Sequence, residues 1–475
     1  MNWQEIVTKN NLDISEVTLN TVLEVNRLDP EFYKPEYLQI DNFLSNKKHF
    51  KLVKNEVVSG PFGSTLKSDE YLDEGIRLIR VQDIKQRYFL DKASMVYISE
   101  ESNNKIKNSE LKSGDLVVSK VGNTIGLVAH IDEQLGRANV SENNIGIKLD
   151  AYPESTKYTI LTFLNSKYGQ SQILRRISGN AQPKLNVFNF TEIIIPTISN
   201  ALQNGIKITI KNAYQNRLDS DKLYSEVEQL LLAELGLDDY IPSEENISIR
   251  DLFGCLQDDR YDAEYWMPKY DEIIATLRNY RKGFSTIGKE FEQLKNNFKK
   301  QPDKEYNYIE IGDVNISTGE VDYTTVIGNE LPANAKVKFD KRQLITSKVR
   351  PNRGATTILN NQEGFIGSGA FIVLKEKENI NLETLMVYLK THPIRELLLR
   401  YNTGTSYPVI TDSDILQLPI PIFEKSLQDK IAELVNLSVK EREESKVLLE
   451  KAKRAVEIFI EQNEDQALTY LSSSV

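Results

Sequence analysis

The sequence predicts an α+β protein in which two globular mixed α/β domains are separated by two long antiparallel helices, with an internal pseudo-two-fold duplication. Four sequence matches occur in the same order in both halves of the chain, and their offset falls gradually from 233 to 225 residues. Two further observations support this fold class. Short apolar runs bounded by turn residues fill each copy, and an apolar stripe of helical spacing follows each copy.

The four matches lie at the start, in the middle and at the end of each copy. The pairs are RLDPEFYKPEY (27–37) with RYDAEYWMPKY (260–270), LIRVQDI (78–84) with YIEIGDV (308–314), DLVVSKVGNTIGLVAHI (115–131) with QLITSKVRPNRGATTIL (343–359), and GNAQPKLNVFNFTEIIIPTI (179–198) with GTSYPVITDSDILQLPIPIF (404–423). The third pair shares Ser-Lys-Val and a glycine five residues later. The duplication therefore predicts two domains of one topology.

The matches divide the chain into six parts. We expect an N-terminal lead segment (1–45), a first globular domain (46–198), a central helix (199–240), an acidic linker with a second lead segment (241–300), a second globular domain (301–424), and a C-terminal helix with a tail (425–475).

Within each globular copy, short apolar runs predict strands and longer ones predict helices. The predicted strands are RLIRVQDI (77–84), DLVVSKV (115–121), TEIIIPTI (191–198), TTVIGN (324–329) and AFIVLK (370–375). Helices are predicted over 158–177 and 382–401, the second interrupted by Pro393.

Each copy is followed by one long amphipathic helix. In the second, apolar residues recur at spacings of three and four or their sums: Leu427, Ile431, Leu434, Leu448, Ala452, Ala455 and Phe459. Its counterpart runs from Leu202 to Leu235 and should end at Gly236. A helix of about 35 residues is about 50 Å long. Its narrow stripe must be covered, either by the other long helix or by its own globular domain, and the constant offset of 225 favours packing of the two helices on each other.

Composition excludes several classes of protein. The chain has 475 residues, a net charge of −10 and a single cysteine, Cys255. Phosphate-binding loops (GxxxxGK[ST]), GxSxG nucleophile motifs and HExxH metal motifs are absent, and one Cys with three scattered His argues against a zinc site. We expect a cytoplasmic location from the cysteine usage and from the lack of a stretch of about 20 apolar residues.

Charge is unevenly distributed along the chain. Residues 233–264 contain ten acidic and two basic residues, whereas residues 336–353 contain seven basic residues and one acidic residue. A local basic patch is what a phosphate-binding surface needs, although charge clusters are also common on ordinary solvated faces. We expect the acidic stretch to face away from any DNA.

The ordered motifs resemble those of the specificity subunit of type I restriction-modification systems. The resemblance is carried by the two Arg-x-Asp-x-Glu-aromatic-aromatic segments, by SGPFGSTLKSDEY (59–71), by KSGDLVVSKVGNTIG (112–126) and by the segments GNAQPKLN and GTSYPVIT, and it covers nearly the whole chain. SGPFGS has no clear counterpart in the second half.

This resemblance implies a non-catalytic DNA-recognition subunit. Each target-recognition domain would recognise one half of a bipartite, asymmetric double-stranded DNA site, and the helices, as a coiled-coil spacer, would set the distance between the half-sites. The family implies two methyltransferase subunits and motor-nuclease subunits as partners, and no membrane. It implies no cofactor on this chain, with S-adenosylmethionine on the methyltransferase subunits.

Base edges in the grooves of DNA are contacted by Arg, Lys, Asn, Gln, Ser and Thr side chains. Residues of these types in equivalent turns of the two copies are therefore our candidates for DNA binding. The first set lies in the segments SKVGNT and SKVRPNR, where a polar turn made possible by glycine is an equally good interpretation: Lys120, Asn123, Thr124, Lys348, Arg350, Asn352 and Arg353. The second set lies in the segments that close each copy, where loop closure around Gly and Pro is the stronger interpretation: Gln182, Lys184, Ser406 and Tyr407.

Candidate partner-docking residues lie in the duplicated lead segments. They are Arg27, Asp29, Phe32, Tyr33, Arg260, Asp262, Tyr265 and Trp266. Packing of aromatic side chains at the base of each helix pair is the alternative, and both interpretations can hold together.

One segment matches a pattern found in methyltransferases. The segment 365–369 fits the FxGxG pattern of S-adenosylmethionine sites, but the repeat places it opposite a strand, and no Asn-Pro-Pro-aromatic tetrad occurs in the chain. A fused restriction-modification enzyme would need that tetrad. A duplicated scaffold without DNA binding, or the specificity subunit of a modification-only system, remain the alternative functions.

Overall fold

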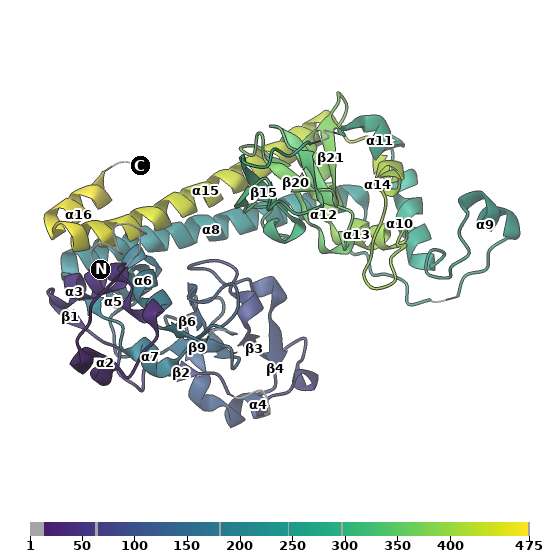
Figure 1. The fold of residues 1–475 in the computed structure, drawn as a ribbon. Coiled ribbons are helices and arrows are strands. Elements are labelled where there is room, and N and C mark those ends of the chain that lie inside the picture. Colours follow the sequence, from purple (N-terminus) through teal and green to yellow (C-terminus); the bar gives the residue numbers. More distant parts are fainter. Residues whose placement is uncertain (1–13, 62–64, 180–181, 246, 296–297, 474–475) are drawn as a thin grey trace. The chain divides into compact units, whose positions relative to one another are not determined.

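The computed structural model describes residues 14–61, 65–179, 182–245, 247–295 and 298–473, which form two compact units (Figure 1). The first unit comprises residues up to 215 together with 444 onward, and the second comprises residues 216–443. In the described part of the chain, no helix is both long and apolar enough to cross a membrane.

In the first unit, short helices precede and follow a strand-rich region. Its helices are α2 (Leu19–Val25), α3 (Pro35–Ser45), α4 (Glu100–Lys105), α5 (Glu154–Asn165), α6 (Lys167–Arg175), α7 (Val187–Thr191) and α16 (Glu464–Ser472). Its strands are β1 (His49–Phe50), β2 (Val57–Ser59), β3 (Ile76–Ile79), β4 (Val96–Ile98), β5 (Leu111–Lys112), β6 (Leu116–Ser119), β7 (Val128–His130), β8 (Arg137–Val140), β9 (Asn144–Ile147), β10 (Ile177–Ser178), β11 (Lys184–Leu185) and β12 (Ile195–Pro196).

The second unit has a related succession of elements. Its helices are α9 (Leu252–Asp258), α10 (Pro268–Arg278), α11 (Ile287–Glu290), α12 (Leu382–Lys390), α13 (His392–Leu399) and α14 (Asp412–Gln417). Its strands are β13 (Phe284–Thr286), β14 (Phe291–Gln293), β15 (Glu305–Ile309), β16 (Thr324–Ile327), β17 (Ala335–Lys338), β18 (Gln343–Ser347), β19 (Thr356–Leu359), β20 (Ile366–Ser368), β21 (Phe371–Glu376) and β22 (Pro419–Pro421).

Both units contain a pair of four-stranded sheets with the same strand order. In the first unit the orders are β2-β9-β6-β7 and β4-β3-β8-β5, and in the second they are β14-β21-β18-β19 and β16-β15-β20-β17. A parallel strand pairing also recurs at the same place, as β3 with β8 and as β15 with β20. The predicted duplication and mixed α/β fold class are therefore confirmed by topology, independently in each unit.

The helices inside each copy are broken at equivalent places. The first is interrupted at Ser166, between α5 and α6, and the second at Thr391, between α12 and α13. In both breaks the hydroxyl donates a hydrogen bond to the carbonyl three residues earlier, at 2.6 and 2.8 Å. The prediction of one continuous helix over 158–177 was therefore wrong, whereas the predicted interruption of 382–401 at Pro393 is confirmed, because this proline lies in the first turn of α13.

The two long helices are α8 (Asn200–Leu235) and α15 (Lys425–Glu461), and they pack on each other within both units. In the first unit the Ser445 hydroxyl donates to the carbonyl of Ala213 at 2.7 Å. In the second, the Ser220 and Ser438 hydroxyls each donate to the other residue's carbonyl, at 2.8 and 2.9 Å. Residue numbers rise on one helix as they fall on the other, so the pairing is antiparallel, as predicted.

Small residues at these crossings let the two helix backbones approach closely. On either side of the crossings, apolar side chains of both helices enter the cores of the units: Leu202, Ile206 and Ile210 meet Ala452, Val456 and Ile460 in the first, and Val227, Leu231 and Leu235 meet Ile431, Leu434 and Val435 in the second. The helix α8 ends where expected, at Gly236, whose φ of 67° is readily adopted only by glycine.

The FxGxG segment forms strand β20 and lies in a sheet. Gly367 is paired with Ile309 on one side and with Val337 on the other. A Cβ at Gly367 would lie 1.9 Å from Cζ of Phe339, so the glycine is required by the packing of this ring. The expectation that this segment is a strand is confirmed.

Candidate nucleic-acid interface

The first lead segment is held against the end of α6 by Arg27. Its guanidinium donates to both carboxylate oxygens of Asp29, at 2.8 and 2.6 Å, and to the carbonyl of Ile177 at 3.0 Å. Arg27 and Arg175 both stack on the Phe32 ring, 4.5 and 4.0 Å from its centroid. The hydrogen bonds from Arg27 lower the pKa of the Asp29 carboxyl below its ordinary value.

The second lead segment repeats this geometry. Arg260 donates to both oxygens of Asp262 at 2.7 Å and to the carbonyl of Asn402 at 3.2 Å. Arg260 and Arg400 lie 4.5 and 4.3 Å from the ring centroid of Tyr265. In the first copy the Tyr33 hydroxyl donates a hydrogen bond to the backbone carbonyl of Arg27 at 2.9 Å. In the second copy the Trp266 indole N–H donates one to the carbonyl of Arg260, also at 2.9 Å.

These lead-segment residues connect the start of each copy to a segment near its end, through the hydrogen bonds from Arg27 to Ile177 and from Arg260 to Asn402. The Phe32, Tyr33 and Tyr265 side chains are buried, so the packing interpretation describes what they contact within the chain. The partner-docking role of the lead segments stays a prediction, and any docking partner would contact the exposed surface around these side chains.

Two candidate DNA-binding segments lie side by side in the second unit, and we call residues 348–354 and 404–410 its paired edge. Val349 forms a β-bridge with Val409. The backbone N–H of Arg350 donates to the carbonyl of Pro408 at 2.7 Å, and that of Ile410 donates to Lys348 at 3.0 Å. Sequence positions more than 50 residues apart thus form one surface.

The basic side chains of this paired edge differ in their freedom to bind a ligand. Arg350 and Arg353 are exposed, and Arg350 lies 5.3 Å from the ring centroid of the exposed Tyr407. Lys348 instead pairs with Asp412 at 2.7 Å and is half-buried. Two polar candidates lie on the same edge. Asn352 is half-buried, and its backbone carbonyl accepts a hydrogen bond from Arg395 at 3.5 Å. Ser406 is exposed.

Backbone conformation fixes the turn that carries the two arginines. Arg350 has a φ of 50° and Gly354 a φ of 74°, with the short 3-10 helix Pro351–Arg353 between them. Residues other than glycine rarely adopt such a φ, and Arg350 does so at an exposed position of the edge. Ser347 supports the turn, because its hydroxyl donates to the carbonyl of Val349 at 2.8 Å.

The first unit has an equivalent paired edge, formed by residues 120–126 and 182–185. Val121 forms a β-bridge with Lys184, and the N–H of Leu185 donates to the carbonyl of Lys120 at 3.0 Å. Asn123, Gln182 and Lys184 are exposed. Residues 180 and 181 of the GNAQPKLN segment and residues 62–64 of SGPFGS lie outside the described residues.

Lys120 and Thr124 are held by their own domain. The ammonium of Lys120 donates to the Ser59 hydroxyl at 2.9 Å and to the carbonyl of Glu142 at 3.2 Å. Partial burial, followed by the neighbouring charge of Lys184, lowers the pKa of Lys120. The Thr124 hydroxyl hydrogen-bonds to that of Ser119 at 3.0 Å, which supports the turn interpretation for this residue.

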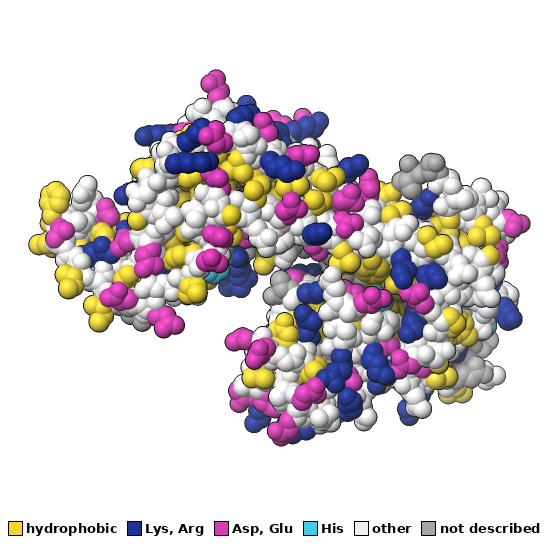
Figure 2. Space-filling model, turned by 180° about the vertical axis from the view of Figure 1, so that it is seen from behind, with side chains coloured by type: hydrophobic (Ala, Val, Ile, Leu, Met, Phe, Trp, Pro, Cys, Tyr) yellow, Lys and Arg dark blue, Asp and Glu magenta, His cyan; other side chains and the backbone are white. Residues whose placement is uncertain are grey.

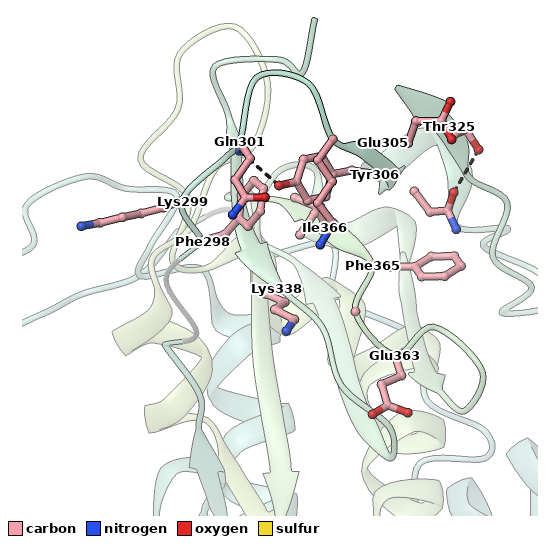
Figure 3. A pocket seen from close by; sticks show the side chains of 13 residues that line it. Phe298, Lys299, Gln301, Glu305, Tyr306, Thr325, Lys338, Glu363, Phe365 and Ile366 are labelled. Carbon is pink, nitrogen blue, oxygen red and sulfur yellow. Dashed lines mark hydrogen bonds between the residues drawn. The ribbon is translucent and has the colours of Figure 1, made fainter. Parts of the chain in front are cut away.

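A basic and aromatic cleft in the second unit was missed from the sequence (Figure 3). It encloses about 590 Å³ at the start of strands β15 and β20, and Lys299, Lys304 and Lys338 are among its lining residues. The Tyr306 ring packs edge-on against Phe298 and lies 5.5 Å from the Lys304 ammonium. Figure 2 shows Lys and Arg side chains gathered over the sheets of this unit, with Asp and Glu among them.

Comparison with protein families assigns the second unit. Residues 282–443 match the model of the family described as "Type I restriction modification DNA specificity domain". The resemblance predicted from the sequence is thereby confirmed, and the specificity domain contains the paired edge with Arg350 and Arg353.

Solved structures of specificity subunits are also similar to the chain, at low identity. The type I restriction-modification S subunit from M. genitalium is 14% identical with a TM-score of 0.38, and the match covers 90% of this chain and 97% of that chain. For the HsdS subunit from Thermoanaerobacter tengcongensis the identity is 11%, the TM-score 0.26, and the coverage 84% and 93%. A search among curated proteins finds no match. The first unit is linked to the specificity domain by its own sheets, which repeat the same strand orders.

Proposed function

We propose that this chain is the non-catalytic DNA-recognition subunit of a type I restriction-modification complex. Each unit recognises one half of a bipartite, asymmetric double-stranded DNA site. The observation that carries the proposal is the paired edge, which occurs at the same topological position in both units and presents exposed polar or basic side chains in each. In the second unit it lies within the matched specificity domain.

The exposed side chains fit the chemistry of base recognition. An arginine can donate two hydrogen bonds to O6 and N7 of guanine in the major groove, which is the commonest specific contact. Arg350 and Arg353 are exposed and lie on a turn fixed by Pro351 and Gly354, so their fork-shaped donors are presented from a rigid support. Asn123 and Gln182 are the corresponding exposed donors and acceptors of the first unit.

Phosphate contacts would position the domains without carrying sequence information. Lys304 and Lys338 in the cleft of the second unit, and Lys184 in the first, are exposed and suit this role. The antiparallel pair α8 and α15 would hold the distance between half-sites. The methyl donor S-adenosylmethionine would be bound by two partner methyltransferase subunits, and motor-nuclease subunits would join for restriction.

Mapping of methylated sites tests the proposal. The chain is combined with its methyltransferase subunits, and the modified sequence is determined for the wild type and for Arg350→Ala and Arg353→Ala, with the matching lysine substitutions as controls. An arginine that contacts a base should cost about 1–3 kcal/mol on removal and relax one position of one half-site. One that contacts a phosphate should weaken all sequences alike.

Three results would contradict parts of this proposal. Unchanged methylation and unchanged salt dependence in both variants would remove the turn from the DNA interface. The absence of any salt-dependent DNA binding by the wild type would favour a scaffold without DNA binding. Methyl transfer or DNA cleavage by the purified chain alone would overturn the non-catalytic role.

A further inference from the structure

The cleft at the start of β15 and β20 combines aromatic rings with lysine side chains (Figure 3). Its described lining includes three rings and three lysines: Phe298, Tyr306, Phe365, Lys299, Lys304 and Lys338. The lysines are exposed, whereas the rings are half-buried. A volume of about 590 Å³ lies in the range of small-ligand sites and is large enough for one nucleotide.

Tyr306 is held in one orientation beside a positive charge. Its hydroxyl accepts a hydrogen bond from the backbone N–H of Gln301 at 3.1 Å, and its ring packs edge-on against Phe298, with 5.0 Å between the ring centroids. The Lys304 ammonium lies 5.5 Å from the centroid of the Tyr306 ring. Figure 3 shows the Phe298 and Tyr306 rings together and the Phe365 ring apart from them. A flat aromatic surface and a cation are therefore neighbours in the cleft.

The charges of the lining favour an anionic ligand. Among the described residues that line the cleft, two are acidic, Glu305 and Glu363. The carboxylate of Glu363 pairs with the ammonium of Lys341, outside the lining, at 2.9 Å. The three lysines of the lining therefore outweigh its acidic groups, and a phosphate would be attracted.

The ring and the cation of this cleft are not part of the duplication. Lys304 and Tyr306 lie 230 positions after Glu74 and Ile76, which is the offset of the strand match that contains β3 and β15. The first unit thus has an acidic and an aliphatic side chain at the equivalent positions. A function shared by both units does not account for the cleft, so we looked for a ligand that the second unit binds by itself.

The chemistry of the lining fits a nucleotide whose base is unpaired. In duplex DNA each base is covered on both faces by its neighbours, and only its edges are accessible in the grooves. Aromatic side chains beside lysines are typical of sites in which a base stacks on a ring while a cation binds the phosphate. Every base has such a face, so this contact carries little sequence preference.

We propose that the cleft binds one unpaired nucleotide, with its base stacked on Tyr306 and its phosphate on Lys304. The nucleotide is either free or part of a DNA strand. This site goes beyond the proposed function, in which duplex half-sites are recognised through base edges, because it recognises the face of a base.

The test is the binding of two probes by the full chain. Fluorescence anisotropy measures a labelled oligothymidine strand, which does not pair with itself, and calorimetry measures free dTMP. The wild type should bind at least one of them, and Tyr306→Ala should weaken this binding by about tenfold or more. Tyr306→Phe keeps the ring and should stay within about twofold of the wild type. Lys304→Met should also weaken the binding, and for the strand it should reduce the salt slope by about one.

Matched controls separate the cleft from the rest of the second unit. Tyr261→Ala and Lys289→Met remove an exposed tyrosine and an exposed lysine outside the lining, and both should bind the probes like the wild type. Circular dichroism checks that each variant is folded. A fully paired duplex should bind to Tyr306→Ala as tightly as to the wild type, because its base faces are covered.

The outcomes distinguish the two sources of the nucleotide and the two proposals. Binding of dTMP identifies a free nucleotide as a ligand, whereas binding of the strand without dTMP identifies a nucleotide within DNA. A wild type that binds duplex DNA but neither probe would overturn this inference and leave the proposed function intact. Inorganic phosphate that competes as well as dTMP, or a loss in Tyr306→Ala that Tyr306→Phe shares, would also overturn it. A wild type that binds dTMP but no duplex DNA would support the cleft and contradict the proposed function.

Discussion

Lys390, at the end of α12, is a buried lysine whose charge should make the stability of the second unit depend on pH. Its ammonium lies 4.9 Å from the ring centroid of Tyr224 and, among the described residues, has no hydrogen-bond partner. Burial, followed by the positive charge of Arg442, lowers its pKa from 10.5 to about 7, and the opposing effect of Glu228 is smaller. Replacement of Lys390 by methionine, which has a similar length, removes the ionisable group.

The magnitude and the sign follow from this pKa. One pKa unit corresponds to about 1.4 kcal/mol, so protonated Lys390 destabilises the folded unit by about 3–5 kcal/mol. Between about pH 7 and pH 10.5 the unfolded chain binds more protons than the folded one, so the stability of the wild type rises with pH in this interval. Lys390→Met should be more stable than the wild type below about pH 7, and this advantage should disappear towards pH 10.

Urea unfolding followed by the fluorescence of Trp266 measures this effect. Trp266 lies in the second unit, and a Trp3→Phe background makes it the only tryptophan of the chain. Lys289→Met, which removes an exposed lysine of the same unit, is the control. The reasoning would be refuted if the stability of Lys390→Met rose above pH 7 as much as that of the wild type. It would also be refuted if Lys390→Met were less stable than the wild type by the same amount at every pH.

Two further perturbations test the packing and the surface of the second unit. Gly367→Ala should destabilise this unit by about 1–3 kcal/mol, because the new Cβ would lie 1.9 Å from the Phe339 ring, and Phe339→Leu should recover part of the loss. Equal stability of Gly367→Ala and the wild type in urea unfolding would contradict this packing. Lys304→Ala and Lys338→Ala should each reduce the salt slope of DNA binding by about one without changing the methylated sequence. A change in the methylated sequence would show that the cleft contacts bases. An unchanged salt slope would show that the cleft lies outside the DNA interface.

The duplication and the long helices could be predicted from the sequence because they depend on local patterns. Ordered matches identify equivalent segments, and spacings of three and four identify the stripes of α8 and α15. Gly236 identifies a helix end because glycine readily adopts the left-handed conformation that ends many helices. The strand after Phe365 was also predictable, because the repeat placed it opposite β8.

Features that depend on contacts between distant residues could not be predicted in this way. The stacking of Arg175 on Phe32, the bridge from Val349 to Val409, and the cleft that joins Phe298 to Phe365 all connect segments far apart in sequence. The candidate site residues were chosen by residue type in two separate turns. That the two turns of each unit form one edge is a finding of the structure.

The central claim is that each unit recognises its own half of the DNA site. Replacement of residues 51–198 by the corresponding domain of another specificity subunit, followed by mapping of the methylated sites, tests it most directly. We expect one half of the target to change, while the other half and the distance between the halves stay the same. A change in both halves, or in neither, would contradict it.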